Sequence, residues 1–160
     1  MTTTTTTNVR FQDASKQAKL KGVLDWWEFN NVNWRKKLDV RTFSLPSGYS
    51  CPFASDCLSK ADRKTGKITD GKNMEYRCFA ATMEARLPSV RNSRWDNFDA
   101  LRKLKTVDAM VAALLDALPV KADVVRIHVG GDFFNQRYFD AWLRVAALRP
   151  QTQFLSLIHI

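Results

Sequence analysis

Residues 123–155, DVVRIHVGGDFFNQRYFDAWLRVAALRPQTQFL, carry the pattern that decides the fold. The β-branched run in 123–129 predicts a strand, and the two glycines that follow it predict a turn. Asn135 is a suitable helix cap, and the apolar residues after it recur at helical spacing as far as a proline. Phe154 begins a second apolar run. Strand, glycine turn, helix and strand make a βαβ unit, whose two strands we expect to run parallel.

Other segments of the chain add a strand, an exposed hairpin and three helices. The predicted strand alternates its side chains and stops at a proline, while charged sequence with two glycines predicts the hairpin. Helix formers, apolar spacing and terminal prolines define the helices, and Thr106 can cap the last of them. The strand is predicted at 40–45, the hairpin within 59–73, and the helices at 78–87, 89–105 and 107–118. The predicted fold class is α/β with parallel βαβ units.

The chain of 160 residues, 45% of them apolar, is long enough for one hydrophobic core. We expect a single α/β domain at 40–155, because no segment within it resembles a linker. The threonine-rich tail at 1–10 has no means of burying apolar surface and is expected to be disordered. Residues 11–39 form an N-terminal extension of mixed pattern.

The sequence shows neither a membrane span nor a secretory signal. No stretch approaches the roughly 18 to 20 consecutive apolar residues of a spanning helix, and the N-terminus lacks an apolar core. We therefore expect a cytoplasmic protein with no membrane partner. A reducing compartment also suits cysteines that are not paired in disulfides.

Cys51 and Cys57 have the spacing C-x5-C, and the third thiol, Cys78, follows after twenty residues. The first two lie in a segment of turn formers, 47–57, and the third opens a predicted helix, whose dipole favours an anionic ligand. Three thiols are an odd number for disulfides, but they suit a metal centre with one open position. An iron–sulfur cluster and a tetrahedral zinc ion are both chemically allowed. The alternative is that the thiols are buried as small hydrophobic groups.

Four residues with suitable chemistry for a site end the strand predicted at 123–129: His128, Gly130, Gly131 and Asp132. In parallel α/β folds the ligand site lies beyond the carboxyl ends of the strands. The glycines would let the backbone approach a cofactor, and the histidine and carboxylate are candidate catalytic groups. The alternative is an interior histidine with a satisfied hydrogen bond and a carboxylate that orders the turn. The sequence contains no dinucleotide fingerprint, phosphate loop or nucleophile elbow, so it assigns no reaction.

The chain is strongly basic, with a formal net charge of +9. A nucleic-acid-binding face needs cations for phosphates and rings for bases, although many basic chains carry only a solvated positive surface. A structural zinc module with a basic nucleic-acid-binding face is therefore the alternative to an iron–sulfur protein. The basic residues concerned are Lys16, Lys19, Lys21, Arg35, Lys36, Lys37, Arg86, Arg91, Arg94, Arg102, Lys103 and Lys105, with Trp34, Trp95 and Phe98 among them.

Three blocks of the sequence resemble the phage gene product 88 family, which occurs in actinobacteriophages and related prophages. They are TFSLPSGYSCPFASDCLSKADRKTGKITDG at 42–71, YRCFAATMEAR at 76–86 and RIHVGGDFFNQRYFDAWLRVAALRP at 126–150. The resemblance covers about 41–154 and implies a phage or prophage protein of uncharacterised function. It also implies that the three cysteines and the H-V-x-G-D-F-F segment, here at 128–134, are features of the family.

A more distant likeness is to radical S-adenosylmethionine enzymes. In those enzymes a cysteine loop after the first strand of a partial (β/α) barrel binds a four-iron cluster with one open iron. The order of strand, cysteine loop and helix is similar here, which implies a partial barrel that is truncated at its C-terminus. Their usual cysteine spacing is C-x3-C-x2-C, and the departure from it argues against S-adenosylmethionine as a cofactor of this chain.

The last residues, LSLIHI at 155–160, do not continue as the family resemblance implies. They resemble translated sequencing adaptor, so we expect a truncated reading frame with a non-native tail at 156–160 and discount His159 as a ligand. A fourth metal ligand could then lie outside this chain. The last strand is also expected to expose an unpaired edge.

Overall fold

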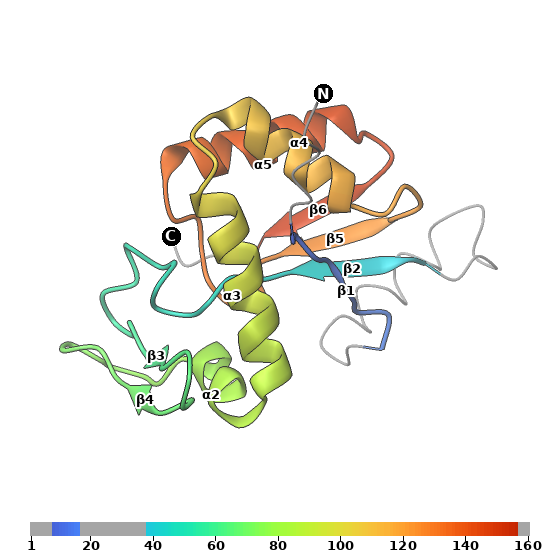
Figure 1. The fold of residues 1–160 in the computed structure, drawn as a ribbon. Coiled ribbons are helices and arrows are strands. Elements are labelled where there is room, and N and C mark those ends of the chain that lie inside the picture. The colour runs from blue at the N-terminus through green and yellow to red at the C-terminus, as the bar shows by residue number, and fades with distance from the viewer. Residues whose placement is uncertain (1–7, 17–37, 157–160) are drawn as a thin grey trace.

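A computed structural model of the chain describes residues 8–16 and 38–156. The described residues form a four-stranded sheet, a separate two-stranded hairpin and four helices (Figure 1), which confirms the α/β class. The strands of the large sheet are β1 (Gln12–Asp13), β2 (Val40–Phe43), β5 (Val124–Ile127) and β6 (Gln153–Ser156). The hairpin consists of β3 (Lys60–Ala61) and β4 (Ile68–Thr69), and the helices are α2 (Phe79–Arg86), α3 (Pro88–Arg102), α4 (Val107–Ala117) and α5 (Gln136–Leu148).

The large sheet has the strand order β1-β2-β5-β6, and its last three strands run parallel. Val124 of β5 is in register with Val40 of β2 on one side and with Gln153 of β6 on the other. The predicted βαβ unit is thereby confirmed, since α5 joins two adjacent parallel strands. The antiparallel strand β1, of two residues, lies in the predicted N-terminal extension and was not predicted. The described strands form an open sheet, and the partial barrel stays a prediction.

Both predicted helix caps are confirmed. Thr106 Oγ1 accepts a hydrogen bond from the Ala109 amide at 3.2 Å, and Asn135 Oδ1 accepts one from the Tyr138 amide at 2.9 Å. Each oxygen satisfies one of the amides at the start of its helix, which has no partner within the helix. These caps fix where α4 and α5 begin.

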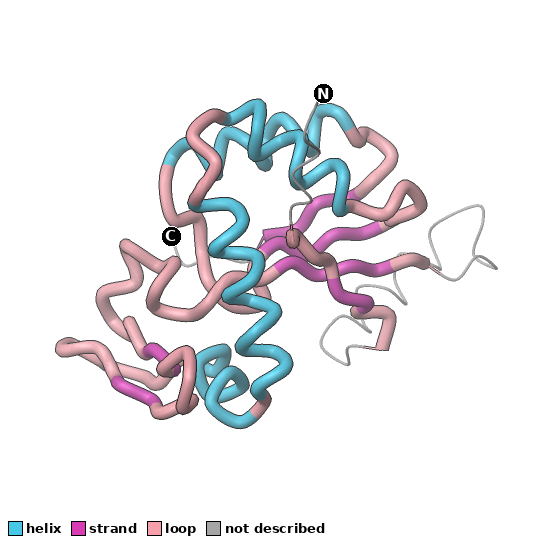
Figure 2. Tube along the Cα trace, in the orientation of Figure 1, coloured by secondary structure: helices cyan, strands magenta, loops and turns pink. Residues whose placement is uncertain are grey.

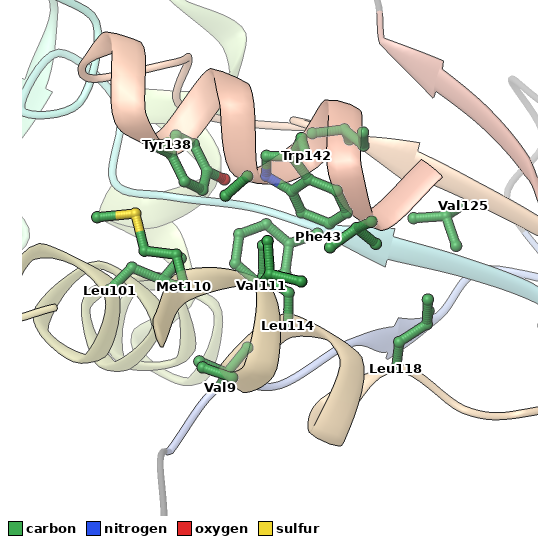
Figure 3. Packing of buried hydrophobic residues seen from close by; sticks show 14 of the residues in the cluster. Val9, Phe43, Leu101, Met110, Val111, Leu114, Leu118, Val125, Tyr138 and Trp142 are labelled. Atoms are coloured by element: carbon green, nitrogen blue, oxygen red, sulfur yellow. The ribbon is translucent and has the colours of Figure 1, made fainter. Parts of the chain in front are cut away.

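The core lies between the sheet and the two helices α4 and α5, which lie together over one face of it (Figure 1). Figure 3 shows Phe43 and Val125 of the strands facing Leu114 of α4 and Trp142 of α5. The rings of Phe43 and Trp142 meet edge to face, with their centroids 5.4 Å apart. This packing holds the carboxyl ends of β2 and β5 side by side.

Residues 44–87 form a second region beyond the carboxyl ends of β2 and β5, here called the cysteine lobe. It contains the hairpin and α2, but Figure 2 shows that most of it is loop, and α3 connects it to the helices over the sheet. The predicted hairpin is confirmed, because Lys60 pairs with Thr69 and Ala61 with Ile68 in antiparallel register.

The predictions for residues 1–7 of the threonine-rich tail, for most of the N-terminal extension and for His159 fall on 1–7, 17–37 and 157–160, which lie outside the described residues. The predicted disorder of the tail as far as residue 10 is wrong for Val9, which is buried in the hydrophobic core, and for Arg10, whose amide donates to Asn97 Oδ1 at 2.7 Å. Among the helices of the described ranges, none is long and apolar enough to cross a membrane.

Candidate metal centre

The first thiol is held by a tight turn that follows β2. The Ser50 hydroxyl donates to the Pro46 carbonyl at 2.8 Å, and the Ser50 amide donates to the same oxygen at 3.1 Å. Gly48, with φ +71°, takes the left-handed conformation that this reversal needs. Its amide donates to Cys51 Sγ at 3.3 Å, and Cys51 is only 8% exposed.

The second thiol lies where the β3–β4 hairpin closes. The Cys57 carbonyl accepts a hydrogen bond from the Gly71 amide at 3.2 Å, and the Cys57 amide donates to the Ala54 carbonyl at 3.2 Å. A Cβ at position 71 would lie 2.7 Å from the Cys57 oxygen, so this close approach of two backbones requires glycine. The hairpin thus returns the chain to Cys57 after fourteen residues.

Ser59 connects the hairpin to the third thiol. Its hydroxyl donates to Asp70 Oδ1 at 3.0 Å and accepts a hydrogen bond from the Cys78 amide at 3.3 Å. Asp70 also accepts a hydrogen bond from Arg77 Nε at 3.1 Å, which fixes the residue before the cysteine. Cys78 then serves as the residue before the first turn of α2.

Burial and neighbouring charges raise the pKa values of Cys51 and Cys57. Burial raises the pKa of Cys51 to about 12, against the lowering effect of the Gly48 amide, and the charges of Asp132 and Cys78 raise it further. Burial also raises the pKa of Cys57, and the charge of Cys78 raises it further. The charge of Cys78 therefore acts on both other thiols.

The three cysteines are free, and Cys51 and Cys57 are buried while Cys78 is half-buried. Neither buried thiol belongs to the hydrophobic cluster between the sheet and the helices. Across the described ranges, no three His, Cys, Asp or Glu side chains already form a set that could hold a metal ion. The assignment of the cysteines as metal ligands stays a prediction.

The glycine turn after β5 packs against the turn that carries Cys51. The Asp132 amide donates to Ser50 Oγ at 3.4 Å, and a Cβ at Gly131 would lie 2.5 Å from the same oxygen. A Cβ at Gly130 would lie 2.4 Å from Arg94 Nη1. Protein groups make the close approach at both glycines, so contact with a cofactor there stays a prediction.

His128 lies in the interior, 4% exposed, with its ring against Phe133 and Tyr138. Its Nε2 is hydrogen-bonded to the Tyr138 hydroxyl at 3.0 Å, but Nδ1 has no hydrogen-bond partner among the described residues. Burial lowers the pKa of His128 to about 3, so the ring is neutral at ordinary pH. Its φ of +63° is a rare conformation for a residue with a side chain.

Asp132 lies between the interior and the cysteine lobe. Its Oδ1 accepts a hydrogen bond from the Phe133 amide at 2.7 Å, so the carboxylate orders the turn as the structural alternative expects. Its charge also raises the pKa values of Cys51 and Tyr138. Catalytic roles for His128 and Asp132 stay predictions.

The sequence reasoning missed Glu84, a fully buried residue of the cysteine lobe. Its Oε1 accepts hydrogen bonds from the Ser47 amide at 2.9 Å, the Ser47 hydroxyl at 2.8 Å and Arg94 Nη1 at 2.6 Å. The only signal in the sequence is helical spacing, which places Glu84 on the same face of α2 as the small residues Ala80 and Ala81.

The basic face predicted for nucleic acid is wrong for three of its residues. Arg91, Arg94 and Trp95 are buried, with 5%, 5% and 7% exposure. Arg91 donates to the Glu84 carbonyl and Arg94 to the Glu84 carboxylate, so both guanidinium groups bind partners inside the protein. Several other members of the predicted face lie outside the described residues: Lys19, Lys21, Trp34, Arg35, Lys36 and Lys37.

Comparisons with known proteins agree on one family. The family described as Gene product 88 matches residues 3–155 of the chain. The chain is also similar to the Gene 88 protein of Mycobacterium phage L5, with 29% identity over 131 residues that cover 76% of this chain and 48% of that protein. The chain thus spans about half the length of this relative. No solved structure matches it, and the likeness to radical S-adenosylmethionine enzymes stays a prediction.

Proposed function

The chain belongs to the gene product 88 family, and from this premise we propose that it binds an iron–sulfur cluster, or another metal, through Cys51, Cys57 and Cys78. The observation that supports this most strongly is that three free thiols lie in the turns and at the helix start of the cysteine lobe, where the charge of Cys78 acts on both other thiols. Thiolates are ligands for both iron–sulfur clusters and zinc. A centre with three protein ligands keeps one metal position open to water, a substrate or a cofactor.

The surroundings of the thiols support the proposal. Burial and neighbouring negative charges favour the protonated forms of Cys51 and Cys57. A metal cation reverses this preference, because coordination replaces the thiol protons with positive charge. The Gly48 amide already donates to Cys51 Sγ, and such a hydrogen bond stabilises a thiolate ligand.

The end of β5 is the part of the sheet that we propose to border the open metal position. Asp132 and Gly131 pack against the turn that carries Cys51, and the carboxylate of Asp132 influences that thiol. Although Arg94 and Ser50 fill the space beside their Cα atoms, the backbone groups of Gly130 and Gly131 are the cofactor contacts that we propose. Asp132 and His128 are the candidate catalytic groups of the proposed site.

Anaerobic purification followed by metal analysis and a visible absorption spectrum tests the proposal. A brown protein with iron and acid-labile sulfide supports the cluster, and S-adenosylmethionine binding is then measured on that protein. One zinc per chain without colour supports the structural alternative. A chain that retains neither metal, and takes up neither during reconstitution under reducing conditions, contradicts the proposal.

A second candidate function is nucleic-acid binding by a structural zinc module. A row of cationic side chains and aromatic rings, here called the stripe, favours it. Lys60 lies over the Tyr49 ring at 5.2 Å, and Arg63 lies over the Trp95 ring at 4.8 Å. The cations can contact phosphates, and the partly exposed Tyr49 offers a ring for a base. This stripe consists of Tyr49, Lys60, Arg63, Phe98 and Arg102, which adjoin the buried ring of Trp95.

Salt-dependent binding tests the second candidate. Asp99 binds both Arg63 and Arg102, so one carboxylate faces two guanidinium groups and the stripe stays positive. Fluorescence anisotropy with single-stranded DNA and RNA is expected to give an affinity that falls steeply with salt. Changing Lys60 and Arg102 to Ala should weaken it, whereas Lys121→Ala, an exposed lysine outside the stripe, should not. Affinity that is undetectable or independent of salt contradicts this function.

A further inference from the structure

We infer that Cys57 and Cys78 form a reversible disulfide, with Cys51 spared, when the metal-free protein meets a small disulfide such as oxidised glutathione. This oxidation site goes beyond the proposed metal function, because it depends only on how the protein brings two thiols together. The pair is 21 positions apart in the sequence, so the contact is created by the hairpin and not by local chain geometry.

Backbone contacts on both sides of Cys57 hold the segment 71–78 around it. The Asp56 carbonyl accepts a hydrogen bond from the Glu75 amide at 2.7 Å, and the Cys57 carbonyl accepts one from the Gly71 amide at 3.2 Å. These bonds bring the chain that leads to Cys78 alongside the chain that leaves Cys57.

Ser59 completes the alignment of the pair. Its hydroxyl lies 3.4 Å from the Cys57 carbonyl oxygen and 3.3 Å from the Cys78 amide nitrogen, so a single oxygen lies between the backbones of both cysteines. The charge of Cys78 also raises the pKa of Cys57, as expected of thiols in neighbouring positions. Such an arrangement suits disulfide formation, which requires Cα atoms within about 7 Å.

Cys51 is placed differently. It belongs to the turn after β2, where its sulfur accepts the Gly48 amide and its neighbour Ser50 binds the strand-end Asp132. Its sulfur is thus occupied by its own turn, and we expect it to stay reduced.

The chemistry is a thiol–disulfide exchange in two steps. Cys78 is half-buried between the exposed Arg77 and Phe79, so a small oxidant reaches it first. Its thiolate attacks one sulfur of oxidised glutathione, which breaks that disulfide and releases one glutathione. The Cys57 thiolate then attacks the Cys78 sulfur, which breaks the mixed disulfide and releases the second glutathione. The two thiol protons end on two glutathione molecules, and the protein loses two electrons.

Oxidation of this pair would remove two of the three proposed metal ligands. Where the proposed function holds, the disulfide therefore prevents metal loading, and reduction by dithiothreitol restores it. This consequence rests on the proposed function, whereas the pairing itself does not.

Peptide mapping of the full chain tests the pairing. The protein is stripped of metal with a chelator, reduced, exchanged into oxidised glutathione, and alkylated with iodoacetamide while unfolded. Trypsin alone leaves Cys51 and Cys57 together on peptide 42–60, so chymotrypsin, which cleaves after Phe53, is also required. We expect the main cross-linked species to join Cys57 to Cys78 and Cys51 to be alkylated.

Two results would overturn the inference. One is a main cross-link that contains Cys51, and the other is glutathione adducts at all three cysteines without a cross-link. Cys51→Ser is expected to keep the same cross-link, and Cys57→Ser to accumulate glutathione on Cys78. Because metal is removed first, failure of the pairing is distinguished from failure of metal binding, which the analysis of the purified protein decides separately.

Discussion

Glu84 of α2 and Arg94 of α3 form a buried ion pair, with 2.6 Å between Oε1 and Nη1 and no more than 6% exposure of either side chain. The same Oε1 accepts both hydrogen bonds of Ser47, at the start of the cysteine lobe. Arg94 also lies against Gly130 at the end of β5. One ion pair therefore connects the lobe that carries the thiols to the strand end that faces it.

Arg94→Ala is expected to destabilise the protein strongly, because it leaves the Glu84 carboxylate buried without its cation. Removing one partner of a buried ion pair costs about 3–5 kcal/mol. Urea denaturation of the wild type and the variant measures this loss in the free energy of unfolding. The double change Glu84→Leu with Arg94→Leu should cost less than Arg94→Ala, because no charge is left unpaired. A loss below about 1 kcal/mol for Arg94→Ala would contradict the role given to the pair.

Gly130→Ala is expected to displace the guanidinium of Arg94, because the new Cβ would lie 2.4 Å from Nη1. Overpacking of this kind costs about 1–3 kcal/mol. The same substitution in an Arg94→Ala background should cost clearly less, since the group it meets is gone. Equal losses in both backgrounds, measured by chemical denaturation, would show that the two residues are independent.

Several elements could be predicted because their signals are local. Thr106 and Asn135 are caps whose side chains bond amides three residues away, so their sequence neighbourhood suffices. The βαβ unit at 123–155 was equally predictable, since its strand, turn and helix differ in periodicity.

Other features depend on contacts between distant residues. The two-residue strand β1 has no pattern of its own and exists because Gln12 pairs with Thr42. Burial of Glu84 and Arg94 depends on each having the other as partner, which neither helix reveals alone. The approach of the Cys57 and Cys78 backbones to each other depends on Ser59 and the hairpin, so the sequence indicated a ligand set but not which cysteines adjoin.

The free energy of unfolding should decrease as the pH is lowered, because His128 is neutral in the folded protein. Its pKa in the folded protein is about 3, against an ordinary value of 6.5, so the unfolded chain binds more protons between these values. The contribution of neutral His128 to the free energy of unfolding is complete above pH 6.5. It is lost as the pH falls below that value, by up to about 1.4 kcal/mol per pH unit. Urea denaturation between pH 7 and pH 5 measures the slope.

His128→Asn is the control for this pH dependence. Asparagine does not titrate, and it tolerates the left-handed conformation better than most residues do. The variant is expected to be less stable at pH 7, because it loses the hydrogen bond to Tyr138, and to show a shallower pH slope. An unchanged slope would show that His128 is not the group responsible.

Asn135→Ala is expected to lower the free energy of unfolding by about 1 kcal/mol, because α5 loses its cap to the Tyr138 amide. Asn135→Asp should retain most of the stability, since a carboxylate accepts the same hydrogen bond. Chemical denaturation of the three proteins measures the difference. If Asn135→Ala and Asn135→Asp lower the free energy of unfolding equally, the hydrogen bond of the cap does not stabilise α5.

The most direct test of the proposed metal centre is the metal content per chain of the wild type and of three variants, Cys51→Ser, Cys57→Ser and Cys78→Ser, all purified anaerobically. Ser55→Ala, an exposed change in the same loop, is the matched control. We predict bound iron with acid-labile sulfide, or zinc, in the wild type and the control, and its loss in each cysteine variant. Equal metal content in the wild type and all three cysteine variants, or none in the wild type, would contradict the account.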